Sequence, residues 1–421
     1  MAIKRFASLK EAFDLTFSNI PLLGTEKLPL GDISGRILAE DVISEVDSPS
    51  TDCSLKDGFA VFSNDLKEAD FNNPVRLRVI GDATAGNRSA MTVSRGNAIK
   101  VTTGAPLPDG ADAVLAEEFS RYMDNEVYCY RNARAGRNVL KRGTDNALGE
   151  VIAEKGTKLT PPIIGFIASA GLDRVVVYRS PRVAVIATGD EVVAPGHHLP
   201  DGKLYASNMV AICAWLSTKG ISFTTEIARD KRDNIAASIE KHLTQVDAFV
   251  TSGGAWGSDR DLTIKVLEDL GWYGLYNKVK IGPGKAISFG LLEGRPFFCL
   301  PGGPPSNEIA FLQLALPGLL RMKGDIHSLF PLVWARLTEK VQGDRDWTQF
   351  IHANITGTQG NLFLVKPLKE GSRLKSMALK DALITIPEGS ETIERGAEIL
   401  IQLLNPLCLY KQNVGLCPTF C

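Results

Sequence analysis

The sequence has no hydrophobic run long enough to cross a membrane. A spanning helix needs roughly 18 or more consecutive apolar residues, and the longest candidate, 309–320, is interrupted by Gln313, Pro317 and Gly318. The first residues, MAIKRFASLKEAFDL, carry charges and contain no apolar core of a signal peptide. We therefore expect a cytoplasmic protein that is not embedded in a membrane.

The chain also has almost no net charge and no zinc-binding motif. Its formal charge is -1 at pH 7, which gives no reason to expect nucleic acid or an anionic membrane as a partner. Its seven cysteines form no C-x-x-C pair, and their odd number argues against a disulfide framework. Its five histidines include no HExxH motif. The composition therefore favours a cytosolic protein without a disulfide framework. Cys408, Cys417 and Cys421 cluster in the tail, which we expect to be unstructured, with metal binding there as the alternative.

No internal repeat or low-complexity segment stands out either. Its 421 residues exceed the size of one hydrophobic core and predict two to four domains. Ser8 and Glu11 form a capping box ahead of a helix that we expect to end near Asn19. Residues 46–144 and those after 325 show short alternating runs separated by turn residues, which is typical of β domains.

What the sequence does contain is a set of apolar runs that end in loops of small residues. The run 248–250 leads into TSGG at 251–254, followed by Asp259, Asp261 and a helical pattern over 262–270. Small residues let backbone amides approach an anion, and a helix N-terminus adds its positive end. Carboxylates beside such a cradle favour a divalent cation between them and a phosphate. The segment predicts a phosphorylated ligand and a metal; the alternative is a tight turn with a solvated acidic cap.

Two further runs end in the same way. The run 181–187 precedes TGDE at 188–191, and 297–300 precedes PGGPPS at 301–306. Continuous apolar runs are typical of parallel strands that are covered on both faces. They alternate with helical patterns, so we predict a doubly wound parallel sheet. Open α/β sheets bind ligands at the carboxyl ends of their strands, and the three loops are expected at that edge.

Several ordered motifs carry a resemblance to a known family. They are CSLKDGFAV at 53–61, TGAP at 103–106, GRN at 136–138 with RGTD at 142–145, TGDE at 188–191, SGG at 252–254 and PGGP at 301–304. In this order they resemble the motifs of the MoeA family of molybdopterin molybdenumtransferases, which includes the E domain of gephyrin. The resemblance covers roughly residues 5 to 404.

The resemblance implies an elongated subunit of α/β and β domains. Its expected parts are a connector (1–45 and 145–178), an inserted β domain (46–144), a doubly wound molybdopterin-binding α/β domain (179–326), a C-terminal β domain (327–404) and a tail (405–421). It also implies a homodimer whose active site is completed by the partner's inserted β domain. The implied reaction inserts molybdate into adenylylated molybdopterin and releases AMP with the help of Mg²⁺. Contact with the molybdopterin adenylyltransferase is a further expectation.

The resemblance also implies roles for particular residues. Catalysis falls to Asp57, Thr103, Glu191, Asp261 and Lys285. Binding of the pterin substrate falls to Thr188, Gly189, Asp190, Ser252, Gly253, Gly254, Pro301, Gly302, Gly303, Pro304, Ser306 and Ser376. From the residues themselves, carboxylates of adjacent loops are expected to hold the metal: Asp190, Glu191 and Asp261, joined by Asp230 at the end of the strand expected over 221–228.

Departures from the family pattern leave alternatives open. Where the family has K-P-G-K, this chain has Gly282, Pro283, Gly284 and Lys285, and Lys280 is a candidate substitute for the first lysine. The PGGP loop replaces the family's P-G-N-P, and a lysine precedes Asp57. The rival hypotheses are a non-catalytic pterin-binding or scaffold paralogue, a tungstate-inserting variant, and a nucleotidyltransferase on the same α/β domain. The β domains that flank the α/β domain disfavour the last.

Overall fold

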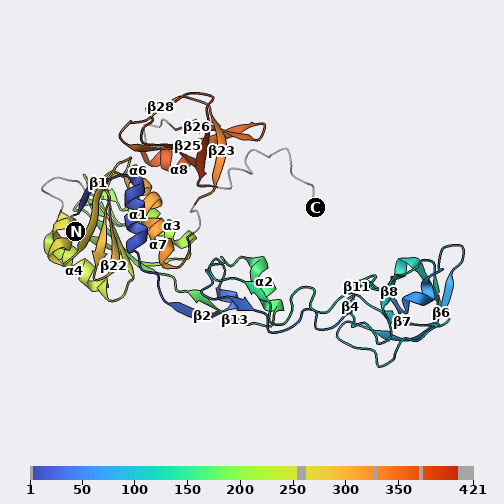
Figure 1. Cartoon of the computed structure of the whole chain (residues 1–421). Helices are drawn as coiled ribbons and strands as arrows, with labels where there is room; N and C mark the ends of the chain where they lie inside the picture. Colours follow the sequence, from blue (N-terminus) through green and yellow to red (C-terminus); the bar gives the residue numbers. More distant parts are fainter. Residues whose placement is uncertain (1–2, 254–261, 327–329, 369–372, 406–421) are drawn as a thin grey trace. The chain divides into compact units, whose positions relative to one another are not determined.

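A computed structural model describes residues 3–253, 262–326, 330–368 and 373–405. The chain divides into two compact units (Figure 1). One unit is Glu26–Val177, and the other comprises Met1–Thr25 with Tyr178–Cys421. The domain boundaries expected from the sequence are finer than this division and stay a prediction. In the part of the chain that the structure describes, no helix is both long and apolar enough to span a bilayer.

The larger unit is built on a seven-stranded sheet with the strand order β1-β19-β21-β22-β18-β14-β17. Strands β14, β17, β18 and β22 run parallel to one another, as predicted. The strands are β1 (Lys4–Ala7), β14 (Arg182–Thr188), β17 (Ser222–Ala228), β18 (Ala248–Ser252), β19 (Tyr273–Val279), β21 (Ser288–Leu292) and β22 (Arg295–Leu300).

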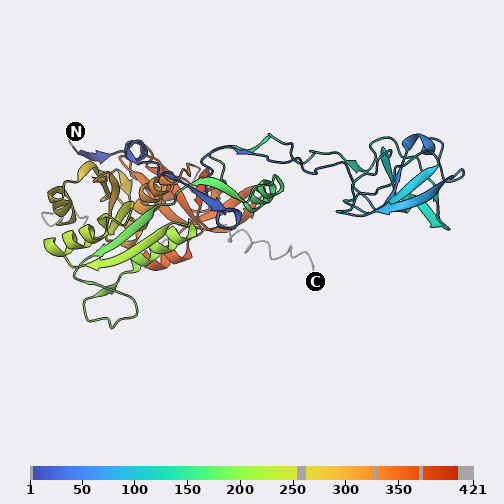
Figure 2. The same cartoon turned by 90° about the horizontal axis from the view of Figure 1, so that it is seen from below.

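Helices cover both faces of this sheet, which explains the continuous apolar runs of its central strands. Along β14, Val183, Val185 and Ala187 pack in one core while Ala184 and Ile186 pack in the other. The first core includes residues of α1, α3, α6 and α7; the second includes residues of α4 and α5 (Figures 1 and 2). The helices are α1 (Leu9–Asn19), α3 (Ser207–Thr218), α4 (Arg232–Leu243), α5 (Leu262–Asp269), α6 (Pro304–Ala310) and α7 (Leu316–Met322).

The sheet is mixed and not wholly parallel, which corrects the sequence prediction. Strand β21 runs antiparallel to both β19 and β22. It is joined to β22 by a two-residue turn at Glu293 and Gly294, whose φ angles are 48° and 77°. Two consecutive positive φ values characterise the tight hairpin turns that match the twist of antiparallel strands. Local sequence favours this hairpin only weakly, because Glu-Gly is a weaker turn signal than Asn-Gly.

The N-terminal segment contributes to the same sheet. Strand β1 pairs in parallel with β19 at the sheet's edge. Helix α1 begins with the predicted capping box, in which Ser8 accepts from the Glu11 amide and the Glu11 carboxylate accepts from the Ser8 amide. Its buried residue Ala12 belongs to the first core. Residues expected at the start of the connector therefore pack on the α/β domain.

The long helical pattern after Pro304 folds as three consecutive segments. Helix α6 leads into a π-helical stretch, Phe311–Ala315, and then into α7. Pro317 stands in the first turn of α7, where its missing amide hydrogen costs least. The residues that interrupt the apolar run in the sequence thus mark a change of helix type. They do not end the helical segment.

The C-terminal part of the larger unit is a closed β-barrel. Its strands follow the order β25-β26-β23-β29-β27, and β27 pairs back with β25. The short β20 extends this sheet by pairing with β25, which links the barrel to the end of β19. The elements are β20 (Ile281–Gly282), β23 (Leu332–Leu337), β25 (Thr348–Gln359), β26 (Leu362–Pro367), α8 (Arg373–Leu379), β27 (Ala382–Ile386) and β29 (Glu398–Leu403).

The smaller unit contains a six-stranded sheet with apolar side chains on both faces. Its strand order is β8-β5-β7-β6-β10-β9. The strands are β5 (Gly58–Val61), β6 (Val75–Ala83), β7 (Asn97–Val101), β8 (Ala113–Ala116), β9 (Ser120–Met123) and β10 (Glu126–Cys129). A separate core gathers around α2 (Pro161–Ser169) and the strand pairs β2–β13 and β3–β12. Those strands are β2 (Thr25–Pro29), β3 (Val42–Ile43), β12 (Val151–Ala153) and β13 (Arg174–Tyr178).

Candidate functional site

The three small-residue loops predicted from the sequence meet at one edge of the sheet. Ala187 at the end of β14 is the register partner of Ser252 on β18, and Ser252 is the partner of Leu300 on β22. Because the three strands are parallel neighbours, their carboxyl ends lie side by side. The loops that begin at Thr188, Gly253 and Pro301 therefore start from adjacent positions.

These loops line a cleft of about 570 Å³. The loops contribute the polar end of the cleft, where Thr188, Glu191, Ser252, Gly253, Gly302, Gly303 and Pro304 lie. The segment between β14 and α3 supplies a more apolar wall with Val192, Leu199, Leu204 and Tyr205, and Met209 of α3 adds to it. A third wall comes from α8 of the barrel, through Arg373 and Leu374. The cleft thus combines a polar end with an apolar wall that suits a ring-bearing phosphorylated ligand.

Close backbone approach explains why a glycine stands at 253. Its φ angle is 111°, and a Cβ atom there would lie 2.4 Å from the carbonyl oxygen of Thr188. A Cβ atom on Gly302 would lie 3.7 Å from the Cα of Gly253. The loops after β14, β18 and β22 are therefore in mutual contact, and a side chain at 253 would force two of them apart.

Two asparagine amides hold the loops in place. Asn307, which is buried on α6, donates from Nδ2 to Ser252 Oγ at 3.0 Å and to the Pro301 carbonyl oxygen at 2.9 Å. Asn208, on α3, donates from Nδ2 to the Gly302 carbonyl oxygen at 2.8 Å. Both side chains bond to loop oxygen atoms, so the loops are preorganised by the helices that follow the strands.

One hydroxyl group at the polar end has no partner. Thr188 is 3% exposed, and its Oγ1 makes no hydrogen bond within the described chain. A buried hydroxyl without a partner is costly, roughly 1–3 kcal/mol. Because Thr188 lines the cleft, a ligand oxygen placed there would satisfy this group.

Carboxylates gather beside the polar end. The Asp230 amide donates to Asp190 Oδ1 at 3.3 Å, and Glu191 lines the cleft. The pKa of Asp230 is raised by partial desolvation at the strand end and then by repulsion from Glu191 and Asp190. The Asp230 side chain is exposed. Glu191 and Asp190 therefore add to the effect of desolvation on the pKa of Asp230.

This group of acids has the donor chemistry of a magnesium site. Mg²⁺ prefers carboxylate oxygens, and a cation would relieve the repulsion that raises the pKa of Asp230. Within residues 3–253, 262–326, 330–368 and 373–405, however, no three acidic, histidine or cysteine side chains converge into a ligand set. Asp261 and Gly254, which the sequence also assigns to this site, lie outside the described residues.

Asp57 and Thr103 belong to the smaller unit, where they contact each other. Asp57 Oδ1 accepts from the Thr103 amide at 2.6 Å and from Thr103 Oγ1 at 3.1 Å. The Thr103 backbone bond, followed by the Thr103 hydroxyl, lowers the pKa of Asp57. The pair is thus a fixed, ionised carboxylate in a unit separate from the one that contains the cleft.

The lysines of the 280–285 segment face the barrel. Lys285 is exposed, and its Nζ lies 6.0 Å from the ring centroid of Trp347. Lys280 Nζ lies 3.3 Å from Glu388 Oε1. Neither lysine is among the residues that line the cleft, so the structure gives Lys280 a partner other than a ligand.

Comparison with known proteins adds family models and relatives to this geometry. Three family descriptions match in order: "MoeA N-terminal region (domain I and II)" at residues 7–171, "Probable molybdopterin binding domain" at 184–321 and "MoeA C-terminal region (domain IV)" at 334–404. A Bacillus subtilis protein named molybdopterin molybdenumtransferase is 31% identical over 390 residues, or 90% of this chain and 90% of that protein. The chain belongs to the MoeA family.

Other similar proteins agree with this membership. A molybdopterin molybdenumtransferase from Haemophilus influenzae is 30% identical over 391 residues, covering 91% of this chain and 95% of that protein. The crystal structure of a molybdopterin biosynthesis MoeA protein from Pyrococcus horikoshii matches with a TM-score of 0.80 at 34% identity, covering 94% of this chain and 99% of that one. The resemblance and the multidomain fold class stated from the sequence are therefore confirmed.

Within this MoeA fold, the cleft contains residues that sequence reasoning missed. Lys203 and Tyr205 come from the segment that joins β14 to α3, Asn208 comes from α3 itself, and Arg373 comes from the barrel. Lys203 Nζ donates to the Asp190 carbonyl oxygen at 2.7 Å, and Tyr205 Oη donates to the His197 carbonyl oxygen at 3.0 Å. None of them belongs to a motif quoted from the sequence. The pairing of β15 (Val192–Val193) with β16 (Leu204–Tyr205) brings the first two to the site.

The residues of the predicted PGGP loop and of α8 differ in position. Pro301 is buried, and its carbonyl oxygen is the acceptor for Asn307. A Cβ atom on Gly303 would lie 3.9 Å from Ser306 Oγ. Ser376 is buried on α8 and is not among the residues that line the cleft. The binding roles predicted for these residues stay predictions.

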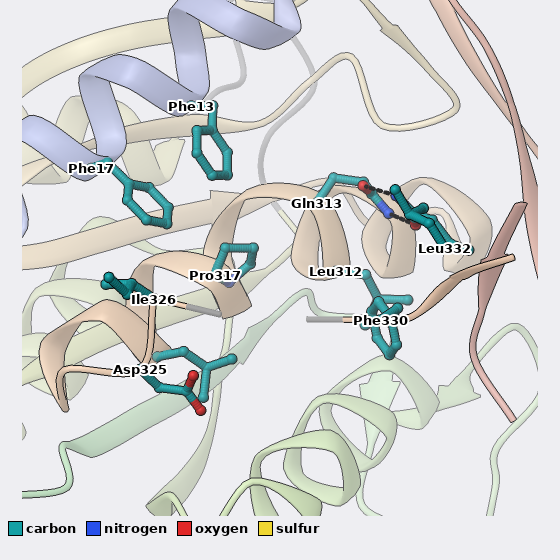
Figure 3. A pocket seen from close by; sticks show the side chains of 11 residues that line it. Phe13, Phe17, Leu312, Gln313, Pro317, Asp325, Ile326, Phe330 and Leu332 are labelled. Atoms are coloured by element: carbon teal, nitrogen blue, oxygen red, sulfur yellow. Dashed lines mark hydrogen bonds between the residues drawn. The ribbon is translucent and has the colours of Figure 1, made fainter. Parts of the chain in front are cut away.

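A second pocket of the MoeA fold lacks these features (Figure 3). It has a volume of about 330 Å³ and lies among residues of α1, the π-helical stretch, α7 and the barrel. Phe13 and Phe17 stack with ring centroids 4.2 Å apart, and Asp325 is the single charged side chain among the described residues that line it. Gln313 and Gln402 pair their side-chain amides beside it, at 2.8 and 3.1 Å. This pocket offers no cradle for a phosphate.

Proposed function

We propose that this chain is a molybdopterin molybdenumtransferase that inserts molybdate into adenylylated molybdopterin and releases AMP. Membership of the MoeA family supports the reaction, and the cleft at the ends of β14, β18 and β22 supports the site. The single observation that carries the site is the buried Thr188 hydroxyl without a partner, which lines the meeting point of three small-residue loops.

The polar end of the cleft is proposed to bind the phosphate groups. Glycines at 253, 302 and 303 leave the backbone accessible there, and the Thr188 hydroxyl supplies a donor. The wall formed by Leu204 and Tyr205 is proposed to receive a ring system, because flat aromatic and aliphatic surfaces favour stacking. A substrate with two ring systems joined through phosphates matches this division.

Cleavage of a phosphoanhydride needs stabilisation of developing negative charge more than it needs a protein nucleophile. In this chain, Thr188 and the amides of the loops hold the phosphate oxygens, and the apolar wall excludes water from the ring end. The role proposed for Glu191 and Asp190 is to hold a cation. Asp230 and Asp261 are proposed as further ligands of this cation. If Mg²⁺ binds to these four carboxylates, it would neutralise charge on the phosphates.

The remaining partners of the site are part of the same proposal. Asp57 and Thr103 form a fixed pair in the smaller unit, and we expect them to complete the cleft of a second subunit in a homodimer. Lys285 is proposed to contact the oxyanion. We also expect a cytoplasmic location and contact with the molybdopterin adenylyltransferase.

A binding-only protein is the second candidate. It is favoured by Gly282, where the family motif has a lysine, and by the position of Lys280 beside Glu388. A tungstate-inserting variant would differ in the oxyanion and use the same cleft. Both alternatives predict substrate binding. The absence of turnover would identify a binding-only protein, and a preference for tungstate over molybdate would identify the tungstate-inserting variant.

The test uses the full-length protein with adenylylated molybdopterin, Mg²⁺ and either molybdate or tungstate. We expect stoichiometric metal retention together with AMP release in the presence of one oxyanion. Thr188→Val should weaken substrate binding about tenfold, the value of one hydrogen bond to a charged group.

Thr251→Val is the matched control for this substitution. The Thr251 hydroxyl is also buried without a partner in the described chain, but it does not line the cleft. Equal behaviour of the two variants would contradict the proposed site. Substrate binding without AMP release, with either oxyanion, would establish the binding-only function instead.

A further inference from the structure

Among the residues that the structure describes, one arginine reaches the cleft from the barrel. Arg373 begins α8 and lines the cleft with Leu374. A Cβ atom on Gly303 would lie 3.9 Å from Arg373 Nη1, so the guanidinium is beside the PGGP loop. The sequence separates this residue from the nearest cleft loop by about seventy positions, and none of the quoted motifs includes it.

The charge of Arg373 is not neutralised by the described protein. Of the two cations that line the cleft in the described part of the chain, Lys203 donates to the Asp190 carbonyl oxygen at 2.7 Å. Arg373 forms neither an ion pair nor a side-chain hydrogen bond with any residue that the structure describes. A guanidinium presents several N–H donors in a planar fork, which matches the oxygens of a tetrahedral anion.

A second observation marks the same end of the cleft as an anion site. The Thr188 hydroxyl is buried, unpartnered and part of the same lining. Gly302 and Gly303 line the cleft as well and have no side chain that would exclude a ligand. A Cβ atom on Gly303 would lie 3.9 Å from Arg373 Nη1, and one on Gly302 would lie 3.7 Å from the Cα of Gly253, which contacts Thr188. An anion at this end would meet a positive fork on the barrel side and a hydroxyl donor on the sheet side.

Helix α8 is fixed over the cleft by a buried ion pair. Lys380, directly after α8, donates from Nζ to Glu308 Oε1 at 2.8 Å and to the Met377 carbonyl oxygen at 2.8 Å. Glu308 belongs to α6, the helix that begins at the cleft residue Pro304. Both charged side chains are 7% exposed. The helix that carries Arg373 is thus tied to the helix that follows the PGGP loop.

We propose that Arg373 is a specificity-determining residue whose guanidinium binds a tetrahedral oxyanion group in the cleft. This inference rests on the proposed function for the identity of that group. It is either a phosphate of the pterin substrate or free molybdate, which share the tetrahedral arrangement of oxygens. On this proposal, the positive charge that faces the bound anion comes from the barrel. None of the family motifs contains this arginine.

The test compares full-length variants in two assays. The first measures AMP release against molybdate concentration, and the second measures binding of molybdopterin that lacks the adenylyl group. Arg373→Met should raise either the half-saturating molybdate concentration or the dissociation constant of molybdopterin about tenfold, because a charge-assisted hydrogen bond is lost. Arg373→Lys should recover part of the loss, since it keeps the charge without the planar fork. Lys375→Met is the control on the same helix, because Lys375 does not line the cleft.

The pattern of loss identifies the source of the oxyanion. A higher half-saturating molybdate concentration with unchanged molybdopterin binding assigns Arg373 to molybdate. Weaker molybdopterin binding with an unchanged molybdate dependence assigns it to the phosphate. If Arg373→Met equals Lys375→Met within twofold in both assays, the inference is wrong.

Failure of the proposed function can be distinguished from failure of the Arg373 proposal. If the wild-type protein releases no AMP, calorimetric titration with inorganic pyrophosphate and with molybdate still compares wild type with Arg373→Met. Weaker binding by the variant would support the oxyanion contact without the reaction. Equal binding of both probes by wild type and variant would overturn it.

Discussion

Replacing Lys380 by methionine should destabilise the barrel strongly. Lys380 and Glu308 are both 7% exposed, and Nζ lies 2.8 Å from Oε1. Removing one member of a buried ion pair leaves the other charge uncompensated, which typically costs about 3–5 kcal/mol. His352 Nε2 lies 3.4 Å from Glu308 Oε2 without hydrogen-bond geometry, so it compensates only part of this loss. We expect a decrease in the free energy of unfolding within that range.

A matched control in the same C-terminal part of the chain is Lys340→Met. Lys340 Nζ also forms an ion pair, at 2.6 Å from Glu394 Oε1, but the side chains are 52% and 66% exposed. Exposed pairs contribute about 0–1 kcal/mol because water screens them. The double variant Glu308→Met with Lys380→Met removes both buried charges and should regain most of the stability lost in Lys380→Met.

The effect should depend on pH in a defined direction. Burial opposes ionisation of Glu308, but His352 and Lys380 outweigh it and lower the pKa of the carboxyl group. A carboxyl group with a lowered pKa stabilises the fold above its unfolded value of about 4.3, and this contribution is lost as the pH falls through the folded pKa. The difference between wild type and Lys380→Met should therefore be largest near pH 7 and shrink below about pH 4.

Urea denaturation followed by tryptophan fluorescence is a suitable assay. Trp334 and Trp347 belong to the barrel portion of the chain, and the barrel transition is fitted separately because multidomain proteins are seldom two-state. Equal losses in Lys380→Met and Lys340→Met would refute the reasoning. A double variant less stable than Lys380→Met alone would refute it as well.

Four further outcomes follow from the site. Glu191→Ala and Asp261→Ala should each abolish AMP release while the circular dichroism spectrum stays unchanged; normal turnover in either variant would contradict the metal-site assignment. Mixing inactive Asp57→Ala and Asp261→Ala subunits should restore part of the activity if the sites are composite, and proven subunit exchange without recovery would count against this. Lys280→Ala should change the molybdate dependence less than twofold, because its ammonium group contacts the barrel; a tenfold change would restore it as the substitute lysine. Asp230→Asn should raise the melting temperature in EDTA at pH 7 but not below its unfolded pKa of about 3.9, because a raised folded pKa makes ionisation destabilising; no difference at pH 7 would contradict the repulsion.

The central part of the sheet was predictable from local sequence. Strands such as β14 and β18 are buried on both faces, so their residues are apolar without interruption. The small residues that follow them are required where backbones come close, as at Gly253. These signals are contained within about ten consecutive residues. They therefore placed the three loops at one edge of the sheet without tertiary information.

The other parts of the site depend on distant contacts, which local patterns do not encode. Arg373 lines the cleft from α8, and Lys380, directly after α8, bonds to Glu308 on a helix that is distant in the sequence. Strand β21 reverses direction through the turn at Glu293, although its apolar residues resemble those of a parallel strand. In both cases the composition of the segment fits several arrangements. The pairing partner, which the segment itself does not specify, decides among them.

The distribution of cations in the cleft bears on the choice between an enzyme and a binding-only protein. The family lysine is replaced by Gly282, and a Cβ atom there would lie 2.5 Å from Gln349 Oε1, so the Gln349 amide occupies the space of a longer side chain. A lysine restored at 282 would have to displace that amide. Positive charge at the cleft instead comes from Lys203 and Arg373, which belong to other elements. Loss of the motif lysine is therefore insufficient to infer loss of anion binding, and the charge of the whole lining is the property to measure.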